Sequence, residues 1–213
     1  MAASTNKSLE LNVQPLSEAN FGVKINGLNP SRISEEQKIL IWDVYRENHG
    51  LICFEFDRLL DAGELYSLTA VFGENEFAPG KINGIGKKAL PSERHLTVDE
   101  QVAIYRARGE DPYTSFIGNV DPKTLKATPT ENKFFGEWEW HTDMSYIQIP
   151  PTFSLLHSRK IPEEGGDTGF CSQVMAARAI SEILRKRVLN LQIKHDSTYG
   201  SSGILRPGMT PPV

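Results

Sequence analysis

The stretch that most constrains the fold and chemistry of this chain is residues 140–146, which read WHTDMSY. It places an imidazole, His141, and a carboxylate, Asp143, two positions apart among aromatic and β-compatible residues. In a β-strand, side chains two positions apart point to the same face of the sheet. We therefore predict that both side chains leave one strand on one side and can take neighbouring positions on a metal ion. A second histidine would complete a two-histidine, one-carboxylate face, which suits Fe(II) and leaves positions open for reactants.

The residues downstream separate this pair from an ordinary histidine and aspartate on a protein surface. A proline pair opens the segment Pro150-Pro151-Thr152, and a glycine-rich turn, Glu164-Gly165-Gly166-Asp167-Thr168, precedes an alanine-rich helix. Thr168 follows Asp143 by 25 residues (168 minus 143). The run from 138 to about 190 resembles the TauD/TfdA family of Fe(II)- and 2-oxoglutarate-dependent dioxygenases in these motifs and in their spacing.

That resemblance implies a set of roles for residues of this chain. His141 and Asp143 are expected to bind iron and to be the catalytic residues, and Thr168 is expected to hydrogen-bond the carboxylate of 2-oxoglutarate. Fe(II), 2-oxoglutarate as co-substrate and O2 are the implied cofactors. The implied reaction is oxidation of a C–H bond of a small, carboxylate-bearing substrate, by hydroxylation, desaturation or oxidative cyclisation. The implied fold is α+β, with a double-stranded β-helix (jelly-roll, cupin-like) core and flanking helices.

The chain departs from the family pattern after the glycine-rich turn. The family carries its second iron-binding histidine and an arginine for 2-oxoglutarate far beyond the His-x-Asp motif, whereas the last histidine here is His195 and the last arginine is Arg206. We therefore expect a fragment or a shortened form that lacks the C-terminal part of the barrel. His195 or His157 can replace the missing ligand only if the fold places it opposite His141.

Two alternatives to an oxygenase stay open at this point. A catalytically inactive, shortened paralogue would bind a small molecule or a protein partner. A metallohydrolase built on His141 and Asp143 would need more histidine ligands than the motif region offers.

Composition bounds the class of protein. The chain has 213 residues, 39% hydrophobic content and a formal net charge of −4, which predicts a single domain over 1–213 with a small-molecule substrate. The charge gives no attraction to nucleic acid or an anionic membrane, and residues 1–11 carry no signal-peptide pattern. We expect a cytoplasmic protein, and a homo-oligomer is left open. Cys53 and Cys171 are expected to be small buried hydrophobic residues.

Local signals predict several elements along the chain. Capping-box patterns start helices at Ser34, Asp61 and Thr97, and Ser172 is expected to cap a single helix that runs to about Asn190. The predicted strands cover residues 9–13, 22–25, 51–56, 114–120, 153–157 and 191–194. Residues 74–135 are broken by proline and glycine and are predicted to be an insertion that covers the site as a lid. Lys81, Lys87, Lys88 and Arg94 in this insertion are candidate contacts for an anionic substrate, and a solvated loop is the alternative.

Overall fold

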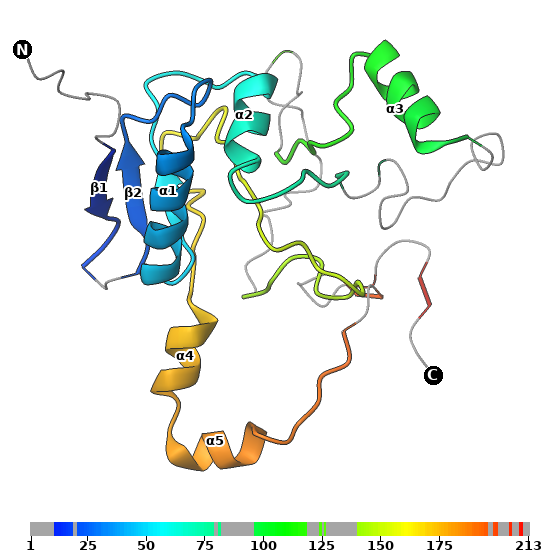
Figure 1. The fold of residues 1–213 in the computed structure, drawn as a ribbon. Helices are drawn as coiled ribbons and strands as arrows, with labels where there is room; N and C mark the ends of the chain where they lie inside the picture. The colour runs from blue at the N-terminus through cyan, green and yellow to red at the C-terminus, as the bar shows by residue number, and fades with distance from the viewer. Residues whose placement is uncertain are drawn as a thin grey trace, which may run out of the picture. The chain divides into compact units, whose positions relative to one another are not determined.

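The fold was determined from a computed structural model, which describes residues 11–18, 21–78, 81, 96–118, 124, 126, 140–195, 198–199, 205 and 209–210 (Figure 1). The chain divides into two compact units. The first unit comprises Met1–Asn75 and Leu155–Leu191, and the second comprises Glu76–Ser154 and Gln192–Val213. Each unit contains segments that are distant in the sequence.

A small mixed β-sheet organises the first unit. Strands β1 (Asn12–Pro15), β2 (Val23–Asn26) and β3 (Ile52–Phe54) lie in the order β1-β2-β3. β1 pairs with β2 in antiparallel register, with Val13 opposite Ile25, and β2 pairs with β3 in parallel register, with Val23 opposite Ile52. Helix α1 (Glu35–Glu47) connects the two parallel strands, as a parallel pair requires. The three predicted N-terminal strands are therefore confirmed, although β1 and β2 lie further along the chain than the predicted 9–13 and 22–25, and β3 is shorter than the predicted 51–56. Residues 9–10 of the first predicted strand lie outside the described residues.

Complete capping boxes begin both helices that pack on this sheet. The Ser34 side chain accepts from the Gln37 N–H, and the Gln37 side chain accepts from the Ser34 N–H, so two of the orphan donors at the start of α1 are satisfied. Asp61 and Glu64 do the same for α2 (Ala62–Thr69). α1 ends where His49 takes a left-handed φ of 58° and Gly50 follows at 84°. Both predicted helix starts are confirmed.

Glu64 also forms a buried polar cluster at the start of α2. Its carboxylate accepts two hydrogen bonds from the Arg58 guanidinium, at 2.5 and 2.7 Å, and a third from the Ser31 hydroxyl at 2.8 Å. The Arg58 guanidinium and the Ser31 hydroxyl lower the pKa of Glu64 to about 2. Because these bonds favour the ionised form, the cluster joins the loop after β2 to α2 at neutral pH.

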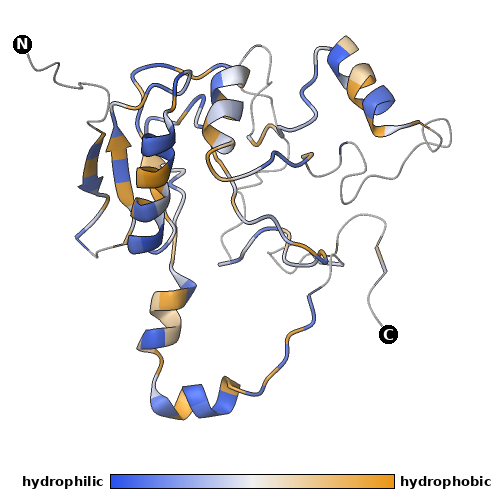
Figure 2. Cartoon of the chain, in the orientation of Figure 1, coloured by the Kyte–Doolittle hydropathy of each residue, from blue (hydrophilic) through white to orange (hydrophobic). Residues whose placement is uncertain are grey.

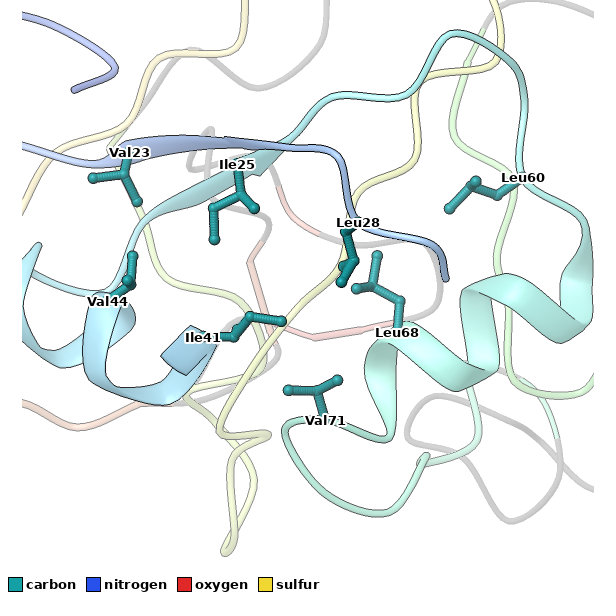
Figure 3. Packing of buried hydrophobic residues seen from close by; sticks show 8 residues of the cluster. All are labelled: Val23, Ile25, Leu28, Ile41, Val44, Leu60, Leu68 and Val71. Carbon is teal, nitrogen blue, oxygen red and sulfur yellow. The ribbon is translucent and has the colours of Figure 1, made fainter. Parts of the chain in front are cut away.

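The hydrophobic core of the first unit lies between the sheet and α1 and α2. Figure 3 shows its side chains pointing toward one another: Val23, Ile25, Leu28, Ile41, Val44, Leu60, Leu68 and Val71. Ile41 is fully buried, and each of the others is at most 8% exposed. Trp42 packs at the edge of this cluster and donates its indole N–H to the Val71 carbonyl at 2.8 Å. This bond ties α1 to the turn that ends α2.

The second unit contains α3 (Val98–Ala107), which begins at the capping box of Thr97 and Glu100 as predicted. Nearby, the rings of Phe77 and Tyr113 stack with centroids 4.9 Å apart. These contacts lie inside 74–135, the range predicted to be an insertion. Half of that range falls outside the described residues, so its role as a lid stays a prediction.

The single helix predicted from Ser172 to about Asn190 is wrong, because two short helices occupy this range. They are α4 (Gln173–Ala179) and α5 (Glu182–Val188). Ile180 and Ser181 between them are extended, and Ser181 caps α5 by accepting from the Leu184 N–H. Serine favours caps over helix interiors because its hydroxyl competes for backbone groups. Neither helix has a buried residue, and Figure 2 shows hydrophobic residues along both.

Other expectations also fail within the described residues. Residues 114–118, 153–157 and 191–194 form no strand, and none of the described strands β1–β3 pairs with them. Residues 119–120, the end of the predicted strand 114–120, lie outside the described part of the chain. Cys53 and Cys171 are exposed rather than buried. For Cys53 the reason is strand alternation, since its neighbours Ile52 and Phe54 turn toward the core and leave it on the opposite face.

The described part of the chain is thus α+β, a small mixed sheet with helices. Its helices include none that is long and apolar enough to cross a membrane.

Candidate active site

The His-Thr-Asp motif lies in a turn of the second unit and not in the predicted strand. Residues 143–146 form this turn, and the Ile147 N–H donates to the Met144 carbonyl at 3.2 Å. Met144 has a φ of 53°, in the left-handed region that residues other than glycine seldom adopt. We call residues 141–147 the motif turn. The predicted strand is wrong because the chain reverses here through Met144, whose left-handed φ has no place in a strand.

The motif turn brings the two predicted iron ligands together. The Nε2 atom of His141 lies 3.4 Å from the Oδ1 atom of Asp143. Imidazole and carboxylate ligands lie about 2.0–2.2 Å from a divalent metal, so ligands at neighbouring octahedral positions are about 3 Å apart. The observed separation is close to that value. A nitrogen and an oxygen donor without a thiolate also match the ligand type of non-haem Fe(II) sites.

The side chains of both predicted ligands are exposed to solvent. The His141 side chain is 36% exposed, and the Asp143 side chain is 66% exposed. To bind a metal, His141 must be neutral so that Nε2 keeps its lone pair.

The structure adds a residue that was missed from the sequence, Ser145. The Nδ1 atom of His195 lies 3.0 Å from its Oγ atom, across 50 residues of sequence. Thus His195 reaches the motif turn through Ser145, two positions beyond Asp143. No local spacing rule signalled this contact, because residue 145 lies in a turn, where strand alternation does not hold, and His195 is 50 residues away.

Thr168 follows the predicted glycine turn. Gly165 and Gly166 have φ values of 70° and 73°, which confirms that this turn needs glycine. Thr168 is exposed and belongs to the first unit, whereas His141 and Asp143 belong to the second. Its role in binding 2-oxoglutarate stays a prediction.

His157 has a structural contact within the first unit. Its Nε2 atom accepts from the Leu60 N–H at 3.5 Å, and burial together with the nearby Arg159 charge lowers its pKa. An imidazole with a lowered pKa stays neutral at physiological pH and so remains an acceptor. His157 therefore helps to hold the segment 155–157 beside the loop that precedes α2.

Among the described residues, no third histidine, cysteine, aspartate or glutamate joins His141 and Asp143 to form a group that could hold a metal ion. Lys81, one of the candidate contacts for an anionic substrate, donates to the Asp111 carbonyl at 2.5 Å and lies 5.7 Å from the Tyr105 ring centre. These contacts give Lys81 a structural role within the second unit. The other candidate contacts and the last arginine lie outside the described residues: Lys87, Lys88, Arg94 and Arg206.

Comparison with known proteins identifies one family. The family model described as "Taurine catabolism dioxygenase TauD, TfdA family" matches residues 12–208. This match includes both units and all three predicted site residues. Among solved structures there is no significant match.

Curated proteins similar to the chain are named as α-ketoglutarate-dependent dioxygenases. The (S)-phenoxypropionate/α-ketoglutarate-dioxygenase of Sphingobium herbicidovorans is 29% identical over 116 residues, 52% of this chain and 40% of that protein. The α-ketoglutarate-dependent sulfonate dioxygenase of Saccharomyces cerevisiae is 25% identical over 191 residues, 88% of this chain and 40% of that protein. The α-ketoglutarate-dependent 2,4-dichlorophenoxyacetate dioxygenase of Burkholderia sp. is 32% identical over 78 residues, 36% of this chain and 26% of that protein. The chain thus matches two fifths or less of each of these relatives.

Proposed function

Because the chain belongs to the TauD/TfdA family of dioxygenases, we propose that it is part of an Fe(II)- and 2-oxoglutarate-dependent oxygenase. The observation that carries this proposal is the 3.4 Å separation of His141 Nε2 and Asp143 Oδ1. It gives two donors of the right chemical type at the spacing that a shared metal ion requires. The names of the similar proteins support an enzyme over a binding module.

In this proposal the motif turn supplies two of the protein ligands. His141 binds through Nε2 as a neutral imidazole, and Asp143 binds through a carboxylate oxygen. Iron held there would supply the activation of O2, coupled to oxidative decarboxylation of 2-oxoglutarate to succinate and CO2. The carboxylate offsets part of the metal charge, and the remaining positions are left to the reactants. The double-stranded β-helix implied by the family belongs to this proposal.

Thr168 is proposed to bind the co-substrate. A hydroxyl next to a two-glycine turn can approach a ligand closely, because the turn carries no side chains that would block it. Its O–H would donate to a carboxylate of 2-oxoglutarate, a charge-assisted hydrogen bond that is stronger than a neutral one. This role can be tested separately from the metal ligands by measuring 2-oxoglutarate affinity in Thr168→Val.

The substrate is proposed to be a small organic acid. Similar proteins are named for phenoxypropionate, a sulfonate and dichlorophenoxyacetate, all of which carry an anionic group. We propose oxidation of a C–H bond in a carboxylate-bearing substrate of this size, by hydroxylation, desaturation or oxidative cyclisation. A cytoplasmic location suits such a metabolite.

The proposal can be tested by anaerobic titration with Fe(II) and 2-oxoglutarate. Chelation of iron by the keto acid gives a visible charge-transfer band, which a binding module for other ligands would lack. We expect Asp143→Ala to weaken formation of this complex by more than about 100-fold, beyond the 10–100-fold that loss of an outer-shell partner costs.

Asp43→Ala is the matched control. Asp43 is an exposed carboxylate on α1 that pairs with Arg46 at 3.4 Å, so its loss should leave the band unchanged. A chain that forms no band, or a band that survives in Asp143→Ala, would contradict the proposed function.

A further inference from the structure

We propose that His195 is a positioning residue that holds the motif turn in the shape required for metal binding. This inference rests on the proposed function and concerns a residue outside the His-x-Asp motif. Its basis is the 3.0 Å contact between His195 Nδ1 and Ser145 Oγ, which joins the turn to a segment 50 residues away in the sequence.

The backbone of the motif turn needs an external support. Met144 is in the left-handed region, which costs free energy for a residue with a Cβ atom and persists where surrounding contacts enforce it. One internal bond, from the Ile147 N–H to the Met144 carbonyl, closes the turn. The Ser145 contact adds a second constraint directly after the strained residue.

The position of Ser145 makes this constraint relevant to the metal ligands. Ser145 follows Asp143 by two residues, so fixing its side chain limits the rotation of the intervening peptide groups. Those peptide groups set the direction of the Asp143 carboxylate relative to His141. His195 therefore acts on the separation of the two donor atoms without binding the metal.

The chemistry of the contact allows it to form with either tautomer of the imidazole. A hydroxyl can both donate and accept, and the Nδ1 atom of imidazole donates or accepts according to the tautomer. Asparagine can place an amide group near the position of Nδ1, whereas phenylalanine fills the space of the ring without a polar atom. His195→Asn and His195→Phe thus separate the hydrogen bond from the packing.

A first experiment uses the metal-free full chain. Amide hydrogen exchange of the peptide that contains residues 145–147 should be faster in His195→Phe and in Ser145→Ala, and close to wild type in His195→Asn. His49→Asn is the matched control, since it changes a histidine of the first unit at a φ of 58° that asparagine tolerates. Equal exchange in wild type, His195→Phe and Ser145→Ala would overturn the proposal whether or not the chain binds metal.

A second experiment uses Co(II) as a spectroscopic probe of metal binding by His141 and Asp143. We expect His195→Phe to weaken Co(II) binding by about twofold to tenfold, as loss of one hydrogen bond allows, and to alter the visible Co(II) bands. His195→Asn should restore both. Failure of the wild type to bind Co(II) through Asp143 would contradict the proposed function, whereas wild-type binding that His195→Phe leaves unchanged would contradict the positioning role alone.

Discussion

Two regions of the first unit have similar helix caps but differ in burial. One is the sheet layer, residues 12–72, and the other is the pair of helices α4 and α5. In the sheet layer, capped helices bury Ile41 and Leu68 almost completely. In α4 and α5 the caps form equally well, yet Ile183 remains 76% exposed and neither helix has a buried residue. Local sequence therefore starts a helix, whereas a core needs a second apolar surface to pack against.

The largest expected difference in the free energy of unfolding is between substitutions of Ile41 on α1 and Ile183 on α5. Ile41→Ala removes a fully buried side chain and should lower the free energy of unfolding by about 2–5 kcal/mol. Ile183→Ala removes an exposed one and should change it by less than about 0.5 kcal/mol. Urea unfolding of the full chain measures both. A loss from Ile183→Ala as large as that from Ile41→Ala would show that α5 is covered in solution.

A smaller effect is expected at the Glu64 cluster, and it depends on pH. The folded pKa of Glu64 is about 2, below the ordinary value of about 4.3. A lowered carboxyl pKa stabilises the fold above the unfolded pKa, and this stabilisation is lost as the pH falls from about 4.3 toward 2. Glu64→Gln should therefore unfold more easily than wild type at pH 6, and the difference should shrink toward pH 2.

The urea midpoint measured between pH 6 and pH 2 tests this expectation. Glu55→Gln is the control, because Glu55 forms an exposed ion pair with Lys24 at 3.1 Å, and exposed pairs contribute little. A constant difference between Glu64→Gln and wild type over this range would show that the Glu64 carboxylate is not the source of the effect.

The smallest expected effect is at two helix caps whose capping hydrogen bonds have the same length. Ser34 and Ser181 each accept a backbone N–H at 3.2 Å. Ser34→Ala should cost about 1 kcal/mol of the free energy of unfolding, because α1 is part of the core. Ser181→Ala should cost less than about 0.5 kcal/mol of that quantity, because α5 buries no residue, and should instead reduce helix content in circular dichroism. Equal losses of unfolding free energy would contradict the contrast between the two regions.

The sequence predicted those parts of the fold that depend on local contacts. The boxes at Ser34, Asp61 and Thr97 were recognised because each residue and its partner lie three positions apart. The break at Ser181 was missed because the residue three positions later is leucine, so the cap lacks the reciprocal partner that marks a box. The exposure of Cys53 was missed because a short strand with one covered face alternates even within an apolar run.

For the candidate site, the sequence predicted the proximity of two side chains but not the backbone that carries them. The spacing of His141 and Asp143 indicated that their side chains meet, and their atoms lie 3.4 Å apart. A left-handed Met144 gives no sequence signal, because methionine rarely adopts this conformation. The contact of His195 with Ser145 spans 50 residues, and rules based on local spacing do not reach that far.

The position of the core in the chain has a consequence for synthesis on the ribosome. Every side chain of the buried cluster lies between Val23 and Val71, so that cluster has left the ribosome before His141 is added. At 5–20 residues per second, roughly 4 to 14 seconds pass between adding residue 71 and residue 141. The sheet layer can therefore collapse while the nascent chain still lacks His141 and Asp143, so binding of the proposed iron would be a late event, separate from formation of this core.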